Sequence, residues 1–144
     1  MRGVEQLTAK EYLFQAKNLD DYIDAKTAEA AQLRSRIMRL QGIRYDGVHV
    51  SGGAKHDFTD TIDSLIRLEQ YIDAQVDKLV GLRKEIGDQI SRIGDNRFRA
   101  VLTRYYLCNE RFETIAKKMG YSLIHIKRLH GLALNDFRKI YSEN

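Results

Sequence analysis

A short basic stretch near the end of the chain, from Ser122 to Arg128, carries the side chains best suited to bind another molecule. On a helix at about 100° per residue, Ile124, Lys127 and Arg128 fall on one side, with His125 nearby. Lysine and arginine donate hydrogen bonds to guanine edges or phosphates, and isoleucine can contact thymine methyl groups. The stretch therefore predicts a helix that enters the major groove of DNA.

The residues just before this stretch add positive charge. Lys117 and Lys118 are expected to contact phosphates, so that their removal should flatten the salt dependence of binding, and Arg111 and Ser122 complete the predicted DNA-contacting set. From Asp95 onward the chain has ten lysines and arginines against five acidic residues, whereas the first 94 residues have 14 basic and 15 acidic ones. This distribution favours an anionic partner for the last third of the chain.

Three helices are expected to position these side chains. Asp95 and Ser122 are suitable N-caps, while Asn109 and Gly120 can adopt the left-handed backbone that ends a helix. Apolar residues recur at helical spacing in all three: Phe98, Val101, Leu102, Tyr105 and Tyr106, then Phe112, Ile115, Ala116 and Met119, then Ile126, Leu129, Ala133, Phe137 and Ile140. The pattern predicts a helix-turn-helix DNA-binding domain over residues 94–144.

Two long helices are expected before this domain. Thr8 and Glu11 have the spacing of a capping box. The first helix carries a heptad seam made of Tyr12, Ala16, Leu19, Ile23, Lys26, Ala30, Leu33, Ile37 and Leu40. The second carries a stripe made of Ile62, Leu65, Ile72, Val76, Leu79, Ile86, Ile90 and Ile93.

The segment between the two long helices is rich in glycine. Gly42 is expected to end the first helix, and residues 42–58 are expected to form a flexible loop. A loop of this length lets the chain reverse, so residues 1–93 are predicted to form an antiparallel, coiled-coil-like helical hairpin. Two helices alone bury only a thin core, which favours a homodimer formed through the hairpin.

Composition supports an all-α protein and gives no sign of an enzyme. The chain of 144 residues has no proline, 43% hydrophobic and 31% charged residues. No phosphate-binding glycine loop, nucleophile motif or metal-ligand spacing occurs, so neither a cofactor nor a metal is expected. Cys108 is expected to be a small buried residue, and His130 a packed structural histidine. The absence of a long apolar run predicts a cytoplasmic protein without a membrane partner.

The segment FETIAKKMGYSLIHIKRLHGLAL resembles region 4 of bacterial sigma factors. The whole layout, with LTAKEYL at Leu7 to Leu13, SGGAK between the long helices and YSLIHIKRLHGLAL at Tyr121 to Leu134, resembles small phage and prophage regulators of the ArpU and RinA activator type. That resemblance implies a sigma-like transcriptional regulator of phage late genes in a bacterial host cell. RNA polymerase is then an expected partner besides double-stranded DNA.

The chain departs from that pattern at two places. Arg111 stands where relatives carry a Ser or Thr that caps the first helix of the motif, and arginine cannot accept the backbone hydrogen bonds of a cap. Leu123 and Ile124 open the last helix where relatives have polar or basic residues. Fewer side chains are therefore expected to read base edges, which makes cooperativity through the hairpin more important.

Two other functions fit the same sequence features. A small terminase-like DNA-packaging component also combines helix-turn-helix units with helical oligomerisation hairpins, but would assemble into a ring of many subunits. An interaction protein that binds polymerase would not contact DNA at all. Oligomeric state and salt-dependent DNA binding distinguish these alternatives.

Overall fold

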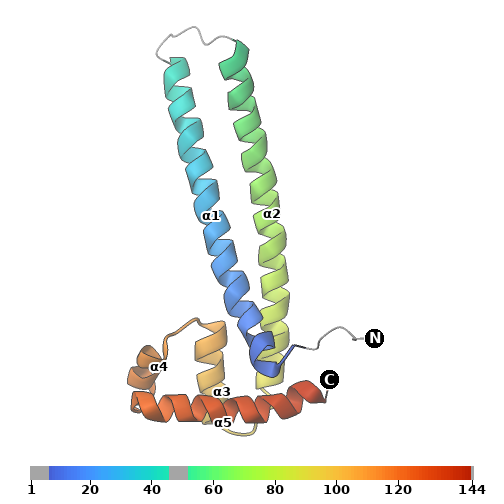
Figure 1. The fold of residues 1–144 in the computed structure, drawn as a ribbon, viewed down its shortest axis with the longest axis vertical. Helices are drawn as coiled ribbons and strands as arrows, with labels where there is room; N and C mark the ends of the chain where they lie inside the picture. The colour runs from blue at the N-terminus through green and yellow to red at the C-terminus, as the bar shows by residue number, and fades with distance from the viewer. Residues whose placement is uncertain (1–6, 46–51, 144) are drawn as a thin grey trace. The chain divides into compact units, whose positions relative to one another are not determined.

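The computed structural model describes the backbone of residues 7–45 and 52–143, and the side chains of residues 7–42 and 56–143. The described elements are α1 (Ala9–Tyr45), α2 (Gly52–Ile90), α3 (Asn96–Leu102), the π-helical turn η1 (Thr103–Leu107), α4 (Phe112–Met119) and α5 (Leu123–Ser142) (Figure 1). Every one of these elements is helical. The predicted all-α class is confirmed.

The start of α1 follows the predicted capping box. The backbone N–H of Thr8 donates to the Glu11 carboxylate at 2.9 Å, and the Glu11 N–H donates to the Thr8 hydroxyl at 3.2 Å. This reciprocal pair satisfies two backbone donors that the first helical turn leaves without partners. The predicted seam of α1 is also confirmed, because each of its nine residues is buried or half-buried.

The long helices extend further than predicted. The expected loop over residues 42–58 is wrong at both ends, since α1 continues through Gly42 to Tyr45 and α2 begins at Gly52. Residues 46–51 of that expected loop lie outside the described residues. A glycine inside a helix costs only about 1 kcal/mol relative to alanine, which is not enough to end a helix of 37 residues.

Contacts divide the chain into two compact units. The basic unit comprises Met1–Leu19 and Leu79–Asn144, and the paired-helix unit comprises Asp20–Lys78. The residues that were predicted to form the C-terminal domain thus share a unit with both ends of the predicted hairpin. By sequence the basic unit has 16 lysines and arginines against nine acidic residues, and the paired-helix unit has eight against eleven. The excess of positive charge therefore lies in the basic unit, while the paired-helix unit has an excess of negative charge.

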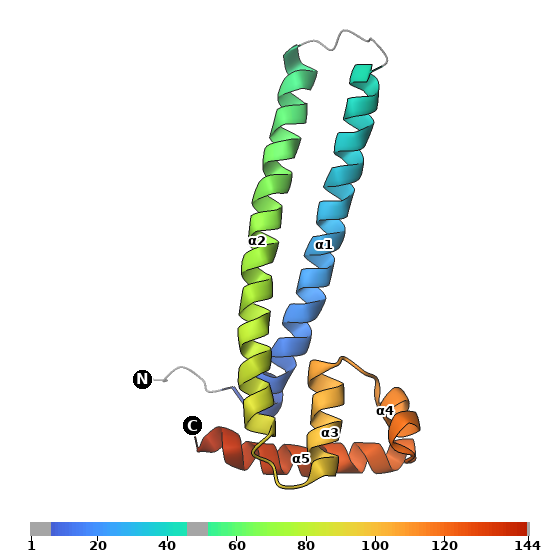
Figure 2. The same ribbon diagram turned by 180° about the vertical axis from the view of Figure 1, so that it is seen from behind.

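In the paired-helix unit, the α1 and α2 segments lie side by side (Figure 1 and Figure 2). Arg34 pairs with Glu69 at 2.6 Å, and the hydroxyls of Tyr22 and Tyr71 are 2.9 Å apart. Its buried residues, among those described, are Ile23, Ala30 and Thr61. Val76, which was predicted to lie in the seam, is exposed, because the apolar stripe of α2 drifts around the helix. The core of this unit is thin.

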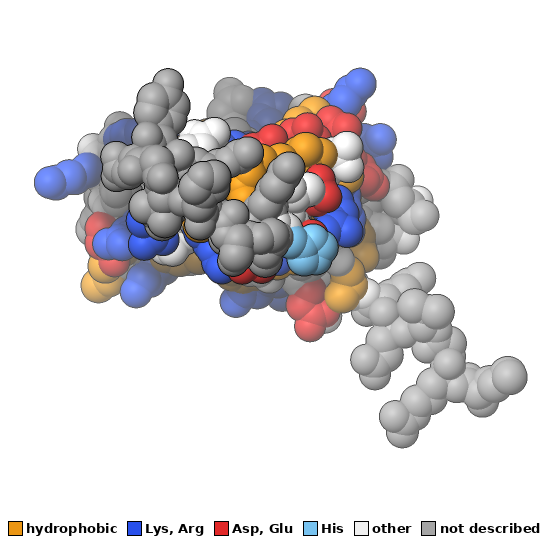
Figure 3. Space-filling view, turned by 90° about the horizontal axis from the view of Figure 1, so that it is seen from above, with side chains coloured by type: hydrophobic (Ala, Val, Ile, Leu, Met, Phe, Trp, Pro, Cys, Tyr) orange, Lys and Arg blue, Asp and Glu red, His pale blue; other side chains and the backbone are white. Residues whose placement is uncertain are grey.

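Basic and acidic side chains alternate on the face of the molecule shown in Figure 3. Blue and red side chains lie next to one another among the described residues of this view, with apolar side chains between them. Such mixing is typical of a solvated surface rather than of a site for one kind of charge.

In the basic unit, α5 is the element around which the others pack. α3 and α4 both contact it, and its buried side chains Ile126 and Leu129 join Val101, Ile115 and Ala116 in one cluster. The beginning of α1 covers the other end of α5, where the ring of Tyr12 stacks on that of Tyr141 at 4.9 Å. The predicted buried face of α5 is confirmed by the complete burial of Phe137 and Ala133.

The turn between α4 and α5 depends on a left-handed residue. Gly120 has a φ of 73°, and the N–H groups of Gly120 and Tyr121 both donate to the carbonyl of Ala116. An added Cβ at Gly120 would meet nothing within 4 Å, so the cost of a substitution is purely conformational. The predicted role of Gly120 in the turn is confirmed.

We expect Gly120→Ala to lower the free energy of unfolding by about 1 to 2 kcal/mol, because a residue with a Cβ is strained in the left-handed region. Gly81→Ala is the matched control: Gly81 lies inside α2, also with nothing within 4 Å, and the substitution should stabilise by up to about 1 kcal/mol. Urea unfolding of both variants measures the difference. Equal stabilities of the two variants would contradict the assignment of Gly120 as a left-handed residue that ends α4.

Candidate nucleic-acid interface

The N-terminal half of α5 presents the residues that were predicted to contact DNA. Ser122 caps the helix as predicted, because its hydroxyl accepts a hydrogen bond from the His125 N–H at 3.2 Å. Ile124, Lys127 and Arg128 are all exposed, and the side chain of Ile124 is 73% exposed. They lie on the side of the helix opposite Ile126 and the other buried residues. The predicted division of α5 into a buried and an exposed face is confirmed.

His125 is held more firmly than its neighbours. Its side chain is half-buried, and its ring lies edge-on to that of Tyr121 with ring centroids 4.6 Å apart. Tyr121 precedes the Ser122 cap, so this contact ties the first turn of α5 to the turn before it. The contact leaves His125 less mobile than Lys127 or Arg128 for reaching a partner.

The two predicted phosphate-contacting residues, Lys117 and Lys118, and the predicted DNA-binding residue Arg111 differ in their surroundings. Lys117 and Arg111 are exposed. Arg111 occupies the N-cap position of α4 without any capping hydrogen bond from its side chain, as predicted. Lys118 is also exposed, but its ammonium group lies 2.6 Å from the carboxylate of Glu110. Lys118 therefore has an acidic partner that the sequence analysis missed.

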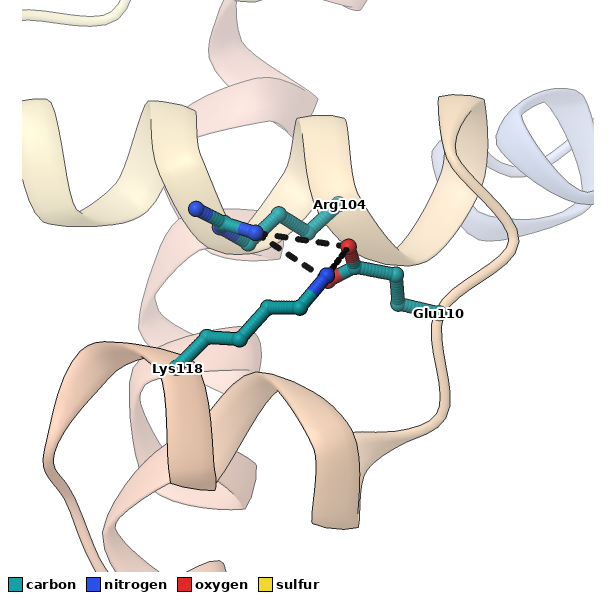
Figure 4. Close-up of polar contacts among 3 residues, drawn as sticks. All are labelled: Arg104, Glu110 and Lys118. Atoms are coloured by element: carbon teal, nitrogen blue, oxygen red, sulfur yellow. Dashed lines mark hydrogen bonds and ion pairs between the residues drawn. The ribbon is translucent and has the colours of Figure 1, made fainter.

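Glu110 lies at the centre of a cluster of three charged residues. Besides Lys118, it accepts hydrogen bonds from the Arg104 guanidinium, whose Nη1 is 3.3 Å from both carboxylate oxygens (Figure 4). The hydrogen bond from Lys118, followed by that from Arg104, lowers the pKa of Glu110. The carboxylate is therefore ionised at neutral pH, and it connects η1 to the last turn of α4.

No local sequence pattern predicts this cluster, because its members lie six and eight residues from Glu110. The turn that follows η1 brings them together. Asn109 has a φ of 54°, which confirms its predicted left-handed conformation, and the Glu110 N–H donates to the carbonyl of Arg104. In the sequence, the available signal for this cluster was an asparagine that can be left-handed, followed by an acidic residue. That signal does not identify the cations that pair with Glu110.

A buried aromatic cluster lies behind this surface. His130 is only 9% exposed, and its Nε2 is 2.7 Å from the hydroxyl of Tyr106, a fully buried residue of η1. Tyr105 stacks on Phe112 at 4.2 Å, and the ring of His130 meets that of Phe112 edge-on. The prediction that His130 is a packed structural residue is confirmed.

The prediction for Cys108 was wrong. Its side chain is exposed, because it follows the last residue of η1, where the chain leaves the core. The π-helical turn itself was not predicted: the Cys108 N–H donates to the carbonyl of Thr103, five residues back. This wider turn ends with Leu107, and the next residue lies outside the packed interior.

Within the described residues, no group of three or more His, Cys, Asp or Glu side chains is arranged to hold a metal ion. No described helix is both long and apolar enough to cross a membrane. The N-terminal half of α5 presents exposed cations beside one exposed isoleucine.

Residues 39–135 match a family model described as a protein of unknown function (DUF1492). The chain belongs to this family. The DUF1492 match includes all of α2, α3, η1 and α4, the end of α1 and the part of α5 that carries Ile124, Lys127 and Arg128. No curated protein and no solved structure matches the chain.

The buried His130 predicts a pH dependence of stability. Burial lowers its pKa from 6.5 to about 4, with a smaller contribution from the positive charge of Lys10. The unfolded chain therefore binds a proton on His130 that the folded chain does not, and stability is lost as the pH falls from about 6.5 to about 4. At 1.36 kcal/mol per pKa unit, the loss is roughly 3 kcal/mol.

Urea unfolding between pH 7 and pH 4 measures this loss. His130→Gln retains a polar partner for Tyr106 but does not titrate, so it should remove that part of the pH dependence. Carboxylates contribute equally to both proteins and cancel in the comparison. The same slope in both proteins would show that His130 binds protons equally in the folded and unfolded chains, so that burial does not lower its pKa.

Proposed function

We propose that this protein is a dimeric, sequence-selective DNA-binding transcriptional regulator of phage or prophage genes. In this proposal α4 and α5 form a helix-turn-helix, and the first half of α5 enters the major groove of double-stranded DNA. The observation that carries the proposal is the exposed group of Ile124, Lys127 and Arg128 directly after a left-handed glycine turn and a serine cap.

The distribution of charge supports the same proposal. The basic unit, which contains α4 and α5, has an excess of seven positive charges, and the paired-helix unit has an excess of three negative charges. Phosphate contacts by lysine and arginine supply most of the affinity of non-specific DNA binding. The resemblance to sigma factor region 4 and to phage activators adds the role in transcription, with RNA polymerase as a further proposed partner.

Selection of bound fragments from a phage or host genomic library, at physiological salt, tests the function. Non-specific electrostatic binding is weak under these conditions, so enrichment depends on base contacts. A regulator should enrich one promoter-proximal sequence. Salt-dependent binding without enrichment would favour a packaging component, and a lack of DNA binding would favour a protein that contacts only polymerase.

Arg128 is the first residue to test. We expect Arg128→Ala to weaken binding to the selected site by more than about 1 kcal/mol, because an arginine in the groove contacts base edges as well as phosphates. Arg138→Ala is the matched control, since Arg138 is an exposed arginine near the other end of α5 that hydrogen-bonds to Asn135. Titrations of the duplex measure both variants. Equal losses would remove Arg128 from the proposed base-reading group.

The proposed dimer rests on the thin core of the paired-helix unit. Only Ile23, Ala30 and Thr61 are buried among its described residues, while the large apolar side chains of Met38 and Ile66 remain exposed. A second copy would remove such side chains from water, and each burial of this kind is worth about 1.5 to 3 kcal/mol. We therefore place the dimer contact on the paired-helix unit.

Ile66→Asp tests the dimer contact, because a carboxylate in an apolar interface loses its hydration. Analytical ultracentrifugation at micromolar concentration should show a dimer for the natural protein and a large shift to monomer for the variant. Arg67→Asp, at the neighbouring exposed position of α2, is the control and should remain dimeric. Dimers in both variants would place the interface elsewhere, and assemblies of eight or more subunits would favour the packaging function.

A further inference from the structure

The cluster of Arg104, Glu110 and Lys118 lies beside the proposed DNA-binding surface but is not explained by it. A carboxylate near a DNA-binding surface repels phosphates, so its position there has a cost unless it has a separate role. Glu110 is also the least exposed member of the cluster: its side chain is 15% exposed, against 50% for Lys118 and 37% for Arg104.

The geometry holds both cations on one carboxylate. Lys118 lies 2.6 Å from Oε1 of Glu110, and Arg104 bonds to both carboxylate oxygens at 3.3 Å. A DNA phosphate that contacts Lys118 has to compete with a carboxylate that is already in contact with it (Figure 4). Lys117, the adjacent residue on α4, is exposed and does not pair with Glu110, whose partners are Lys118 and Arg104. The two lysines are therefore unequal as phosphate ligands.

We propose that Glu110 limits the phosphate-dependent affinity of this surface for DNA by retaining Lys118. This inference rests on the proposed DNA-binding function. Base contacts from α5 act only on the correct sequence, whereas phosphate contacts act on every duplex. By lowering the number of phosphate contacts, Glu110 lowers the affinity for every duplex without contacting a base.

Glu110→Gln tests the inference, because it keeps the size of the side chain and removes its charge. The measurement is the affinity for an unrelated duplex at several salt concentrations. One additional phosphate contact should steepen the slope of log K against log salt by about 0.9. The ratio of specific to non-specific affinity should stay the same, because the added contact forms on both duplexes while α5 gains no base contact.

Glu113→Gln is the matched control. Glu113 is an exposed acidic residue in the first turn of α4, the helix that carries Lys118, so the substitution changes the net charge by the same amount as Glu110→Gln. Its effect on the salt slope should be smaller than that of Glu110→Gln. The double variant Glu110→Gln with Lys118→Gln should restore the natural slope, because the released cation is then absent.

A comparison of the two lysines provides a test that retains Glu110. Lys117→Gln should reduce the salt slope by about 0.9, whereas Lys118→Gln should change it much less. Equal effects of the two substitutions, or equal effects of Glu110→Gln and Glu113→Gln, would overturn the inference while leaving the DNA-binding function intact. Binding that does not depend on salt in the natural protein would overturn both.

Discussion

The buried pair of Tyr106 and His130 is the constraint on which the basic unit depends. Both rings carry polar atoms, and removal of such atoms from water is costly unless they bond to each other. Their contact at 2.7 Å joins η1 to the middle of α5. Because the wider π-helical turn also places Tyr105 against Phe112, one local change in backbone geometry fixes the positions of three elements.

This arrangement explains how α4 forms without a capping side chain. Arg111 provides no cap, so the first turn of α4 lacks the hydrogen bond that a Ser or Thr would supply. Phe112, the next residue, is instead stacked on Tyr105 and meets the edge of His130. Lys17 of α1 supports Tyr105 from the other side, since its ammonium lies 4.2 Å from the ring centroid and donates to the Tyr105 carbonyl. Packing thus replaces a lost hydrogen bond.

The features that the sequence predicted correctly depend on neighbouring residues. Thr8 and Ser122 cap their helices, Asn109 and Gly120 are left-handed, and the buried face of α5 follows from a spacing of three and four residues. Each of these requires only a residue type and a short range along the chain. The all-α class follows from the same local patterns, repeated over long stretches.

The features that the sequence did not predict depend on contacts between distant residues or on a balance of small energies. Glu110 could not be assigned its partners, because a carboxylate pairs with whichever cations the fold brings near it. The π-helical turn differs from an α-helix by a single shifted hydrogen bond, and it leaves Cys108 exposed. The continuation of α1 through Gly42 reflects a glycine penalty too small to end the helix.

The exposed group on α5 includes a large apolar side chain, because Ile124 is 73% exposed. Ile124 gains nothing from solvent, and unlike Lys127 or Arg128 it cannot be explained as a solubilising residue. Among the four bases, thymine alone presents a methyl group in the major groove, so an isoleucine can favour A·T pairs without donating a hydrogen bond. In the proposed function, a helix that recognises DNA through such an apolar contact obtains little sequence discrimination from each half-site. If two copies act together, the contributions of the half-sites add in one complex, so the discrimination that each helix provides is combined in a single binding event.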